Sequence, residues 1–180
     1  ERIQLLLSDV SPVTNVVEMA VFPPFPYLQQ VSDSLSSTCI VLGAQDVCAE
    51  DNGAFTGEVS ASMLIDFGCR FVIVGHSERR LYYGENDALI ARKCEKALAL
   101  GLIPILCVGE TESEKVKHLT KQVIGRQLSF VLEHLGVEAF DKIVVAYEPI
   151  WAIGTGLIAS PEEAEEAHCF LRSQVAEKSE

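Results

Sequence analysis

The sequence predicts an α/β protein in which helices cover a parallel β-sheet. Five short apolar runs recur along the chain with helical patterns between them, an alternation typical of parallel sheets, at 17–22, 40–44, 71–74, 103–108 and 143–147. The runs are almost continuously apolar, as expected for strands buried on both faces. An open doubly wound sheet and a βα barrel both fit, but the first strand-to-helix turn lacks the G-x-G-x-x-G motif of dinucleotide-binding sheets.

The first two helices are predicted from their apolar spacing and from the glycines that follow them. Residues 60–67 read as a short helix that Gly68 ends. Residues 87–100 place apolar side chains on one face, and Gly101 follows. Glycine ends helices readily because it adopts the left-handed conformation without a steric penalty. These two segments therefore fit as the connections between successive strands.

Two further helices are predicted from capping boxes, in which a hydroxyl residue is followed three positions later by glutamate. Thr111 begins one such pattern, and we expect a long helix from there to near Gly136. Ser160 begins the second, with Pro161 at the first helical position and acidic residues in the first turn, and this helix runs to about Lys178. Each pattern satisfies backbone N–H groups that the start of a helix leaves unpaired.

Composition limits the classes of function. The chain has 180 residues, enough for about one domain, and its 14 basic and 26 acidic residues give a net charge of −12. Such a charge disfavours nucleic acid and anionic membranes as partners. No apolar run approaches the roughly 18 residues of a membrane span, and no secretory signal opens the chain. The six cysteines form no C-x-x-C pair, so we expect reduced thiols and a cytoplasmic protein.

Polar residues gather where the predicted strands end, at 45–46, 75–78, 109–110 and 147–148. His76 directly follows a buried strand and is predicted to begin a short helix, whose N–H groups favour a neutral imidazole. A simple capping role for His76 is the alternative. Glu148 ends another strand and precedes a Pro-Trp hinge and the Gly154-Thr155-Gly156 tip, which suits a general base under a mobile lid.

A carboxylate base and a neutral imidazole that share one cavity suit a specific reaction. Glu148 would take a proton from carbon, and His76 would move protons between two neighbouring oxygens of a hydroxy-carbonyl compound. The enediolate formed in this way needs nearby hydrogen-bond donors to hold its charge. The sequence therefore predicts an enzyme that moves hydrogen between adjacent carbons.

Several stretches of the chain closely resemble the triosephosphate isomerase family, and the resemblance extends over essentially the whole length. The matching stretches are Val-Gly-His-Ser-Glu-Arg-Arg at 74–80, Ala-Tyr-Glu-Pro-Ile-Trp-Ala-Ile-Gly-Thr-Gly at 146–156, and shorter segments at 43–46, 53–58 and 104–110. The resemblance implies a (β/α)8 TIM barrel, a homodimer and a cytoplasmic enzyme of glycolysis and gluconeogenesis. It also implies a phosphorylated triose substrate, with no cofactor and no metal.

The resemblance also implies roles for individual residues. This family is a familiar example of a glutamate base with a neutral histidine electrophile, and these roles fall on Glu148 and His76. Glu78 matches a supporting carboxylate of the catalytic site. The Gly154 N–H would meet the substrate phosphate, and Ile153 would close over the base.

Two mobile or protruding segments are implied as well. The lid would comprise residues 151–156, and its remaining members are Trp151, Ala152, Thr155 and Gly156. The 46–58 loop, with Thr56 at its tip, resembles the arm that inserts into a second subunit in this family.

Relative to the family, the chain looks truncated at both ends. A complete barrel of this kind has eight strands in roughly 250 residues, and we expect one incomplete barrel domain over 1–180 with about five parallel strands. Residues 3–7 read as the remnant of the first helix, and the Asn-x-Lys motif of the first strand is absent. The outer strands should then expose apolar faces, and the isolated chain should be poorly stable and nearly inactive. A truncated, non-catalytic chain with a structural or interaction role is the alternative, and another sugar-phosphate barrel enzyme is a third.

Overall fold

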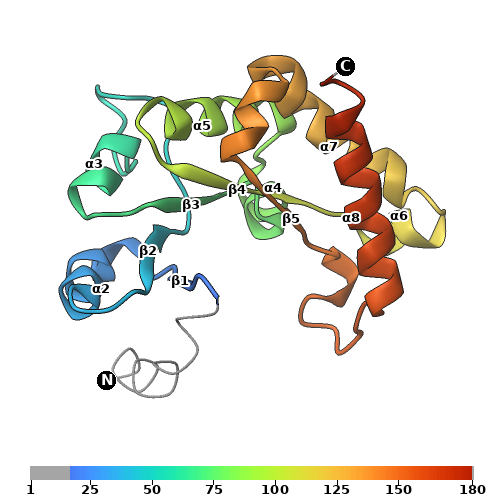
Figure 1. The fold of residues 1–180 in the computed structure, drawn as a ribbon, viewed down its shortest axis with the longest axis horizontal. Coiled ribbons are helices and arrows are strands. Elements are labelled where there is room, and N and C mark those ends of the chain that lie inside the picture. The colour runs from blue at the N-terminus through green and yellow to red at the C-terminus, as the bar shows by residue number, and fades with distance from the viewer. Residues whose placement is uncertain (1–16, 180) are drawn as a thin grey trace. The chain divides into compact units, whose positions relative to one another are not determined.

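The computed structural model describes residues 17–179 and contains the predicted alternation of strands and helices (Figure 1). The strands are β1 (Ala20–Val21), β2 (Val41–Ala44), β3 (Phe71–Val74), β4 (Ile103–Val108) and β5 (Val144–Tyr147). The α-helices are α2 (Leu28–Leu35), α3 (Ala61–Asp66), α4 (Ser77–Tyr83), α5 (Asp87–Ala99), α6 (Glu112–Val116), α7 (Thr120–Leu135) and α8 (Pro161–Ala176). Three 3-10 helices complete the elements, namely η1 (Phe25–Tyr27), η2 (Val137–Lys142) and η3 (Ile150–Ala152).

The strands follow one another in the sheet in chain order, from β1 to β5. The pairs β1–β2, β2–β3 and β4–β5 are parallel, with Ala20 opposite Val41, Gly43 opposite Phe71, and Ile105 opposite Val144. All five predicted strands are therefore present, although β1 is shorter than the apolar run that predicted it. Parallel strands present their carboxyl ends at the same edge of a sheet, which is where ligand sites form in such proteins.

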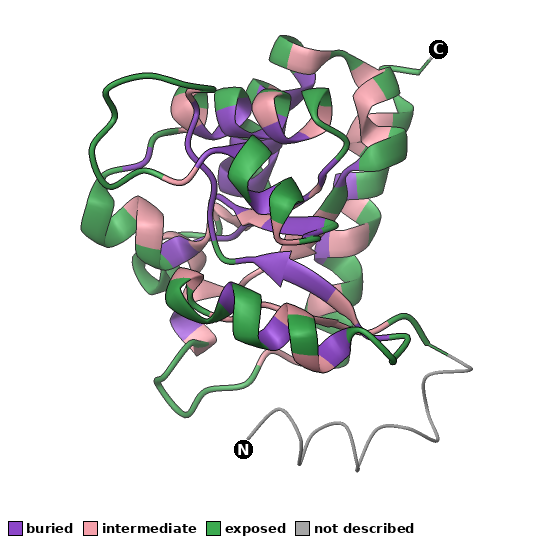
Figure 2. Ribbon diagram, turned by 90° about the vertical axis from the view of Figure 1, so that its left-hand side faces the viewer, coloured by how far each residue is buried: buried purple, intermediate pink, exposed green. Residues whose placement is uncertain are grey.

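The residues group into two compact units, and the boundary between them cuts through β3, α5 and β4. The first unit comprises residues 1–73 and 96–103, and its described core is built around Leu28, Leu42 and Leu64. The second comprises residues 74–95 and 104–180, and its core includes the buried apolar faces of α5 and α7. In Figure 2 the buried residues are concentrated along strands and on one side of the helices, as amphipathic helices require.

Within the second unit, α7 packs against α8, and α8 packs against β5. The capping box of Ser160 is present, and its side chain accepts a hydrogen bond from the Glu163 N–H at 3.1 Å. The capping box of Thr111 is also present, but it opens the short helix α6 rather than one long helix to Gly136. The chain breaks between α6 and α7, where His118 has a left-handed backbone with φ of 57°. The single helix predicted for this segment was wrong.

The outer strands expose apolar side chains, as the sequence predicted. Val17, just before β1, is 49% exposed, and Val144 of β5 is 46% exposed. The predicted helix remnant at 3–7 lies outside the described residues. Across residues 17–179 the structure has no helix whose length and hydrophobicity would let it cross a membrane.

Candidate active site

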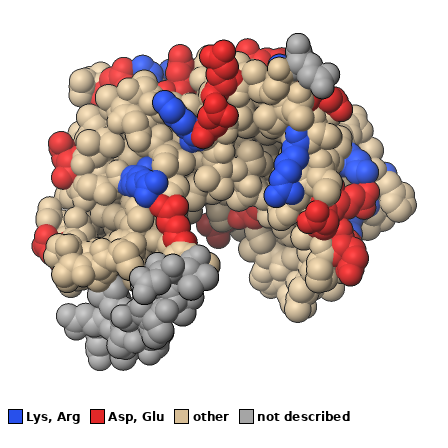
Figure 3. Space-filling model, viewed as in Figure 1, with Lys and Arg blue, Asp and Glu red and all other residues tan. Residues whose placement is uncertain are grey.

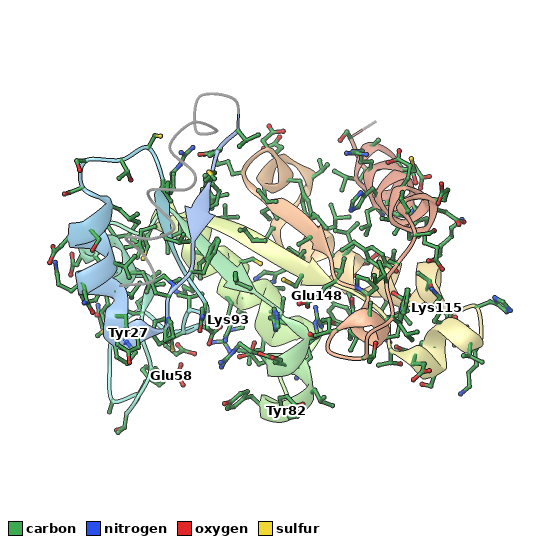
Figure 4. The ribbon with its side chains drawn as sticks, turned by 90° about the horizontal axis from the view of Figure 1, so that it is seen from below. Tyr27, Glu58, Tyr82, Lys93, Lys115 and Glu148 are labelled. Atoms are coloured by element: carbon green, nitrogen blue, oxygen red, sulfur yellow. The ribbon has the colours of Figure 1, made fainter. Side chains whose placement is uncertain are left out.

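The two residues on which the predicted chemistry depends are direct neighbours in the second unit. Glu148 follows β5 and His76 follows β3, so both lie at carboxyl ends of strands (Figure 4 labels Glu148). The His76 Nε2 atom is 2.7 Å from Glu148 Oε1, and the two side chains are 30% and 19% exposed. A carboxylate and an imidazole thus lie next to each other at a site that is partly open to solvent, where a small substrate could contact both.

Hydrogen bonds indicate which nitrogen of His76 carries the proton. His76 caps α4, and its Nδ1 accepts the Glu78 N–H at 3.3 Å. A nitrogen that accepts a hydrogen bond carries no proton, so this geometry fits the predicted neutral ring, with Nε2–H donating to Glu148. The start of α4 adds to this preference because its N–H groups disfavour a positive ring. The capping role and the predicted neutral imidazole are therefore compatible, since one ring nitrogen serves each.

The backbone around His76 brings a second donor to the carboxylate. The Ser77 N–H donates to Glu148 Oε2 at 3.0 Å, across 71 residues of sequence. This geometry depends on Gly75, whose φ of 76° lies in the left-handed region and whose added Cβ would lie 3.2 Å from Ile90. A tight turn between β3 and α4 therefore aims both the ring and the N–H at Glu148.

Gly109 lies buried beneath Glu148 and lets the two chain segments approach closely. A Cβ at Gly109 would come within 1.8 Å of the Glu148 carbonyl oxygen, so no side chain fits there. Gln127 of α7 fixes Gly109, because its Oε1 accepts the Gly109 N–H at 2.8 Å and its Nε2 donates to the Gly109 carbonyl at 3.1 Å. The position of the predicted base is thus set by a buried glutamine on a distant helix.

Glu110 is buried, at 1% exposure, and it joins the strand ends to the start of the lid segment. Its carboxylate accepts hydrogen bonds from Tyr147 Oη at 3.0 Å, Trp151 Nε1 at 2.9 Å and Thr120 Oγ1 at 3.2 Å. Three donors compensate a buried charge that would otherwise be unfavourable. Burial, followed by the negative charge of Glu110, raises the pKa of Tyr147, so this hydroxyl stays protonated and donates.

The predicted lid residues differ sharply in burial. Trp151 is only 7% exposed, whereas Ile153 is 44% exposed and the 154–156 tip is exposed. Ala152 is intermediate, and Thr155 Oγ1 donates to the Trp151 carbonyl at 2.7 Å. The segment is therefore anchored at its first residue and open to solvent at its tip.

Two other residues implied by the resemblance, Glu78 and Thr56, are exposed. Glu78 is exposed, and its Oε2 lies 3.7 Å from His76 Nδ1. Thr56 is exposed in the first unit, in the 46–58 segment. Tyr82 and Tyr83 of α4 are 73% and 72% exposed (Figure 4 labels Tyr82).

Cys107 of β4 and Arg80 of α4 stabilise the strand ends near the site. Burial, followed by the charge of Glu148, raises the pKa of the Cys107 thiol to about 12, so it stays neutral at physiological pH. Arg80 donates to the carbonyls of Gly75 at 2.7 Å and Cys107 at 3.2 Å, and it pairs with Asp87 at 2.5 Å. Arg80 therefore forms a structural ion pair with Asp87 beside the strand ends.

Gln127 and Glu110 had no individual role predicted from the sequence, although each fixes part of the site. Gln127 interrupts the apolar face of α7, and a lone amide on such a face is a usable signal. Glu110 and Arg80 lie in segments that resemble the family, and no local sequence pattern distinguishes them from charged residues at the surface. Among residues 17–179, no group of three His, Cys, Asp or Glu side chains could hold a metal ion.

Glu148 and His76 lie together at the carboxyl ends of parallel strands, beside a segment whose tip is exposed, an arrangement that suits the class of enzymes that move protons at carbon. The profile of the family described as triosephosphate isomerase matches residues 1–180. The triosephosphate isomerase of Thiobacillus denitrificans is 54% identical over 172 residues, which are 96% of this chain and 69% of that protein.

Two further relatives carry the same name. The protein of Dechloromonas aromatica is 55% identical over 160 residues, which are 89% of this chain and 64% of that protein. The protein of Cupriavidus pinatubonensis is 50% identical over 173 residues, which are 96% of this chain and 71% of that protein. The chain thus spans about two thirds of the length of these relatives, from 64% to 71%. The chain belongs to the triosephosphate isomerase family. The predicted α/β fold of the TIM-barrel type, with five parallel strands, is confirmed.

Proposed function

We propose that this protein interconverts dihydroxyacetone phosphate and glyceraldehyde 3-phosphate, without a cofactor or a metal, in glycolysis and gluconeogenesis in the cytoplasm. The observation that supports this best is the 2.7 Å contact between His76 Nε2 and Glu148 Oε1, at the carboxyl ends of two parallel strands. The family membership supplies the substrate class, and the contact supplies the two groups that the reaction needs.

In the proposed reaction, Glu148 removes a proton from the carbon beside the carbonyl group of the substrate. The electron pair of that C–H bond becomes the C=C bond of an enediolate, and negative charge develops on the former carbonyl oxygen. His76 Nε2–H donates to this oxygen and then moves a proton between the two oxygens. Glu148 returns its proton to the neighbouring carbon, so the substrate gains and loses no atoms overall.

The hydrogen bonds that Glu148 accepts in this structure indicate which contact a bound substrate must displace. The Glu148 carboxylate accepts Nε2–H of His76 and the N–H of Ser77, so both donors are occupied. A substrate carbonyl oxygen would take the place of Glu148 Oε1 as the acceptor of Nε2–H. The freed carboxylate oxygen could then accept the proton from carbon.

We further propose that the lid closes over bound substrate, so that Ile153 shields Glu148 from water and the Gly154 N–H meets the phosphate. The exposed tip at 154–156 and the buried Trp151 support a segment that moves about its first residue. Glu78 is proposed to support the site electrostatically, as the resemblance implies.

A homodimer is proposed from two exposed surfaces, one in each unit. The 46–58 segment carries Thr56 at an exposed position in the first unit. In the second unit, Leu81, Tyr82 and Tyr83 of α4 are 70%, 73% and 72% exposed, an apolar surface that a partner subunit would cover. Thr56→Glu should reduce the sedimentation coefficient from that of a dimer to that of a monomer.

The activity is tested with a coupled isomerase assay on the chain and on a chimera. In the chimera, this chain replaces the matching segment of the Thiobacillus denitrificans relative. Glu148→Gln and His76→Gln should each lower kcat by about 10²- to 10⁴-fold, the usual contribution of general acid–base groups. Glu162→Gln, at an exposed position of α8, is the matched control. If Glu148→Gln retains the kcat of the unsubstituted chimera, the proposed function is wrong.

A further inference from the structure

Lys115 of α6 contacts both ends of the segment that contains the lid. Its Nζ atom lies 3.3 Å from the centroid of the Trp151 ring, at the start of that segment. The same Nζ is 2.5 Å from Oε1 of Glu163, in the first turn of α8, where the segment ends. One ammonium group thus contacts Trp151, at the start of the 151–160 segment, and Glu163, just beyond its end (Figure 4 labels Lys115).

The contact between the Lys115 ammonium and the Trp151 ring is a cation–π interaction, which has appreciable strength. An ammonium over the face of an indole ring is attracted by the electrons of that face, and the attraction grows as water is excluded. Trp151 is 7% exposed and the Lys115 side chain is 32% exposed, so the pair is partly shielded. The edge of the same ring is held by Glu110, which accepts from Trp151 Nε1 at 2.9 Å. Lys115 and Glu110 therefore fix the ring from two directions.

The contact with Glu163 continues into the backbone at the end of the segment. Glu163 uses Oε1 for Lys115 and Oε2 for the Ser160 N–H, at 2.8 Å. Lys115, and then the Ser160 N–H, lower the pKa of Glu163, so this carboxylate remains charged near neutral pH. In Figure 3 acidic and basic side chains lie side by side over the region of α6 and α8. The chain of contacts runs from Trp151 through Lys115 and Glu163 to Ser160.

We infer that Lys115 is a positioning residue that holds the two ends of the 151–160 segment together and so sets how far the lid opens at rest. The inference rests on the proposed function for its link to catalysis, but not for its structural content. Lys115 touches neither Glu148 nor His76 in the contacts described for residues 17–179, and it acts through Trp151.

The chain offers a matched control in Lys121 of α7. Its Nζ pairs with Glu166 Oε1 of α8 at 2.8 Å, and both lysines line one cavity of about 450 Å³ between α6, α7 and α8. Lys121→Met removes an ion pair between a lysine and a glutamate of α8, as Lys115→Met does, but it removes no contact with Trp151. Lys115→Met removes both contacts, and Lys115→Arg retains a cation that can stack on the ring and pair with Glu163.

The deciding measurement is hydrogen exchange of the peptide that spans 152–159, on the 180-residue chain. Lys115→Met should exchange about twofold to fivefold faster than the unsubstituted chain, the ratio expected for one partly exposed cation–π contact. Lys115→Arg and Lys121→Met should exchange at the original rate. Trp151 is the only tryptophan, so its fluorescence should change in Lys115→Met alone.

Kinetics of the chimera give the catalytic readout, because loosening a hinge changes kcat and KM together. Lys115→Met should change both by more than twofold, and Lys121→Met should leave both unchanged at a similar melting temperature. Exchange and fluorescence need no turnover, so they test the inference even if the isomerase assay fails. If Lys115→Met matches Lys121→Met in exchange at 152–159, Lys115 does not position the lid and the inference is overturned.

Discussion

Replacing Gly109 by alanine should displace the proposed base while leaving its chemistry intact. The new Cβ would lie 1.8 Å from the Glu148 carbonyl oxygen and 2.7 Å from its carbonyl carbon. Since ordinary contacts begin near 3.4 Å, one of the two segments must move by about 1.6 Å. Gln127 holds both backbone polar groups of Gly109, so the shift falls mainly on Glu148. A displacement of about 1 Å can cost about 100-fold in rate.

We therefore expect Gly109→Ala to lower kcat of the chimera by about 100-fold and to destabilise the fold by about 1–3 kcal/mol, as overpacking does. The assays are isomerase kinetics, urea unfolding and hydrogen exchange of the Ser77 amide, whose bond to Glu148 should weaken. Gly125→Ala in α7 is the control, because its Cβ would meet only the Phe170 ring, at 3.2 Å, and that side chain can move. A folded Gly109→Ala variant with kcat within threefold of the original would refute the reasoning.

Three further predictions concern the scaffold. Gln127→Leu should destabilise the fold by about 3 kcal/mol in urea unfolding, because two buried backbone groups of Gly109 lose their partners, whereas Gln122→Leu at an exposed position of α7 should have little effect. His118→Gly should stabilise the protein by about 0.5 kcal/mol, because relief of a left-handed backbone exceeds the cost of the extra freedom of glycine in the unfolded chain, and an unfolding midpoint no higher than the original would contradict this. The pKa of Cys107, raised from 9.0 to about 12, means that the folded state keeps this proton longer than the unfolded state. Its contribution to stability should be complete below pH 9 and be lost as pH rises toward 12, and alkylation at pH 8 should not reach Cys107 before the exposed Cys39.

The strands could be predicted because burial on both faces leaves a continuous apolar run in the sequence. The helix starts at Ser160 and Thr111 could be predicted because a capping box is a local pattern. The break between α6 and α7 could not, since His118 adopts a conformation that usually marks glycine.

The candidate site also contains residues that could be predicted from the sequence and contacts that could not. His76 and Glu148 stood out because each follows an apolar run, and the resemblance to a family fixed their expected roles. The contacts that hold them did not stand out, because the Ser77 N–H and Glu148 are 71 residues apart and Gln127 reaches Gly109 across 18. Such pairs are created by the fold, and no local spacing in the sequence records them.

The proposed reaction depends most on a neutral His76 whose Nε2–H points at Glu148. The direct measurement is the ¹⁵N NMR spectrum of the His76 ring near neutral pH, in the chain labelled on histidine and compared with His76→Gln for assignment. We expect a protonated Nε2 and an unprotonated Nδ1, because Nδ1 accepts the Glu78 N–H. A doubly protonated ring, or a proton on Nδ1 alone, would contradict the proposed roles of both residues.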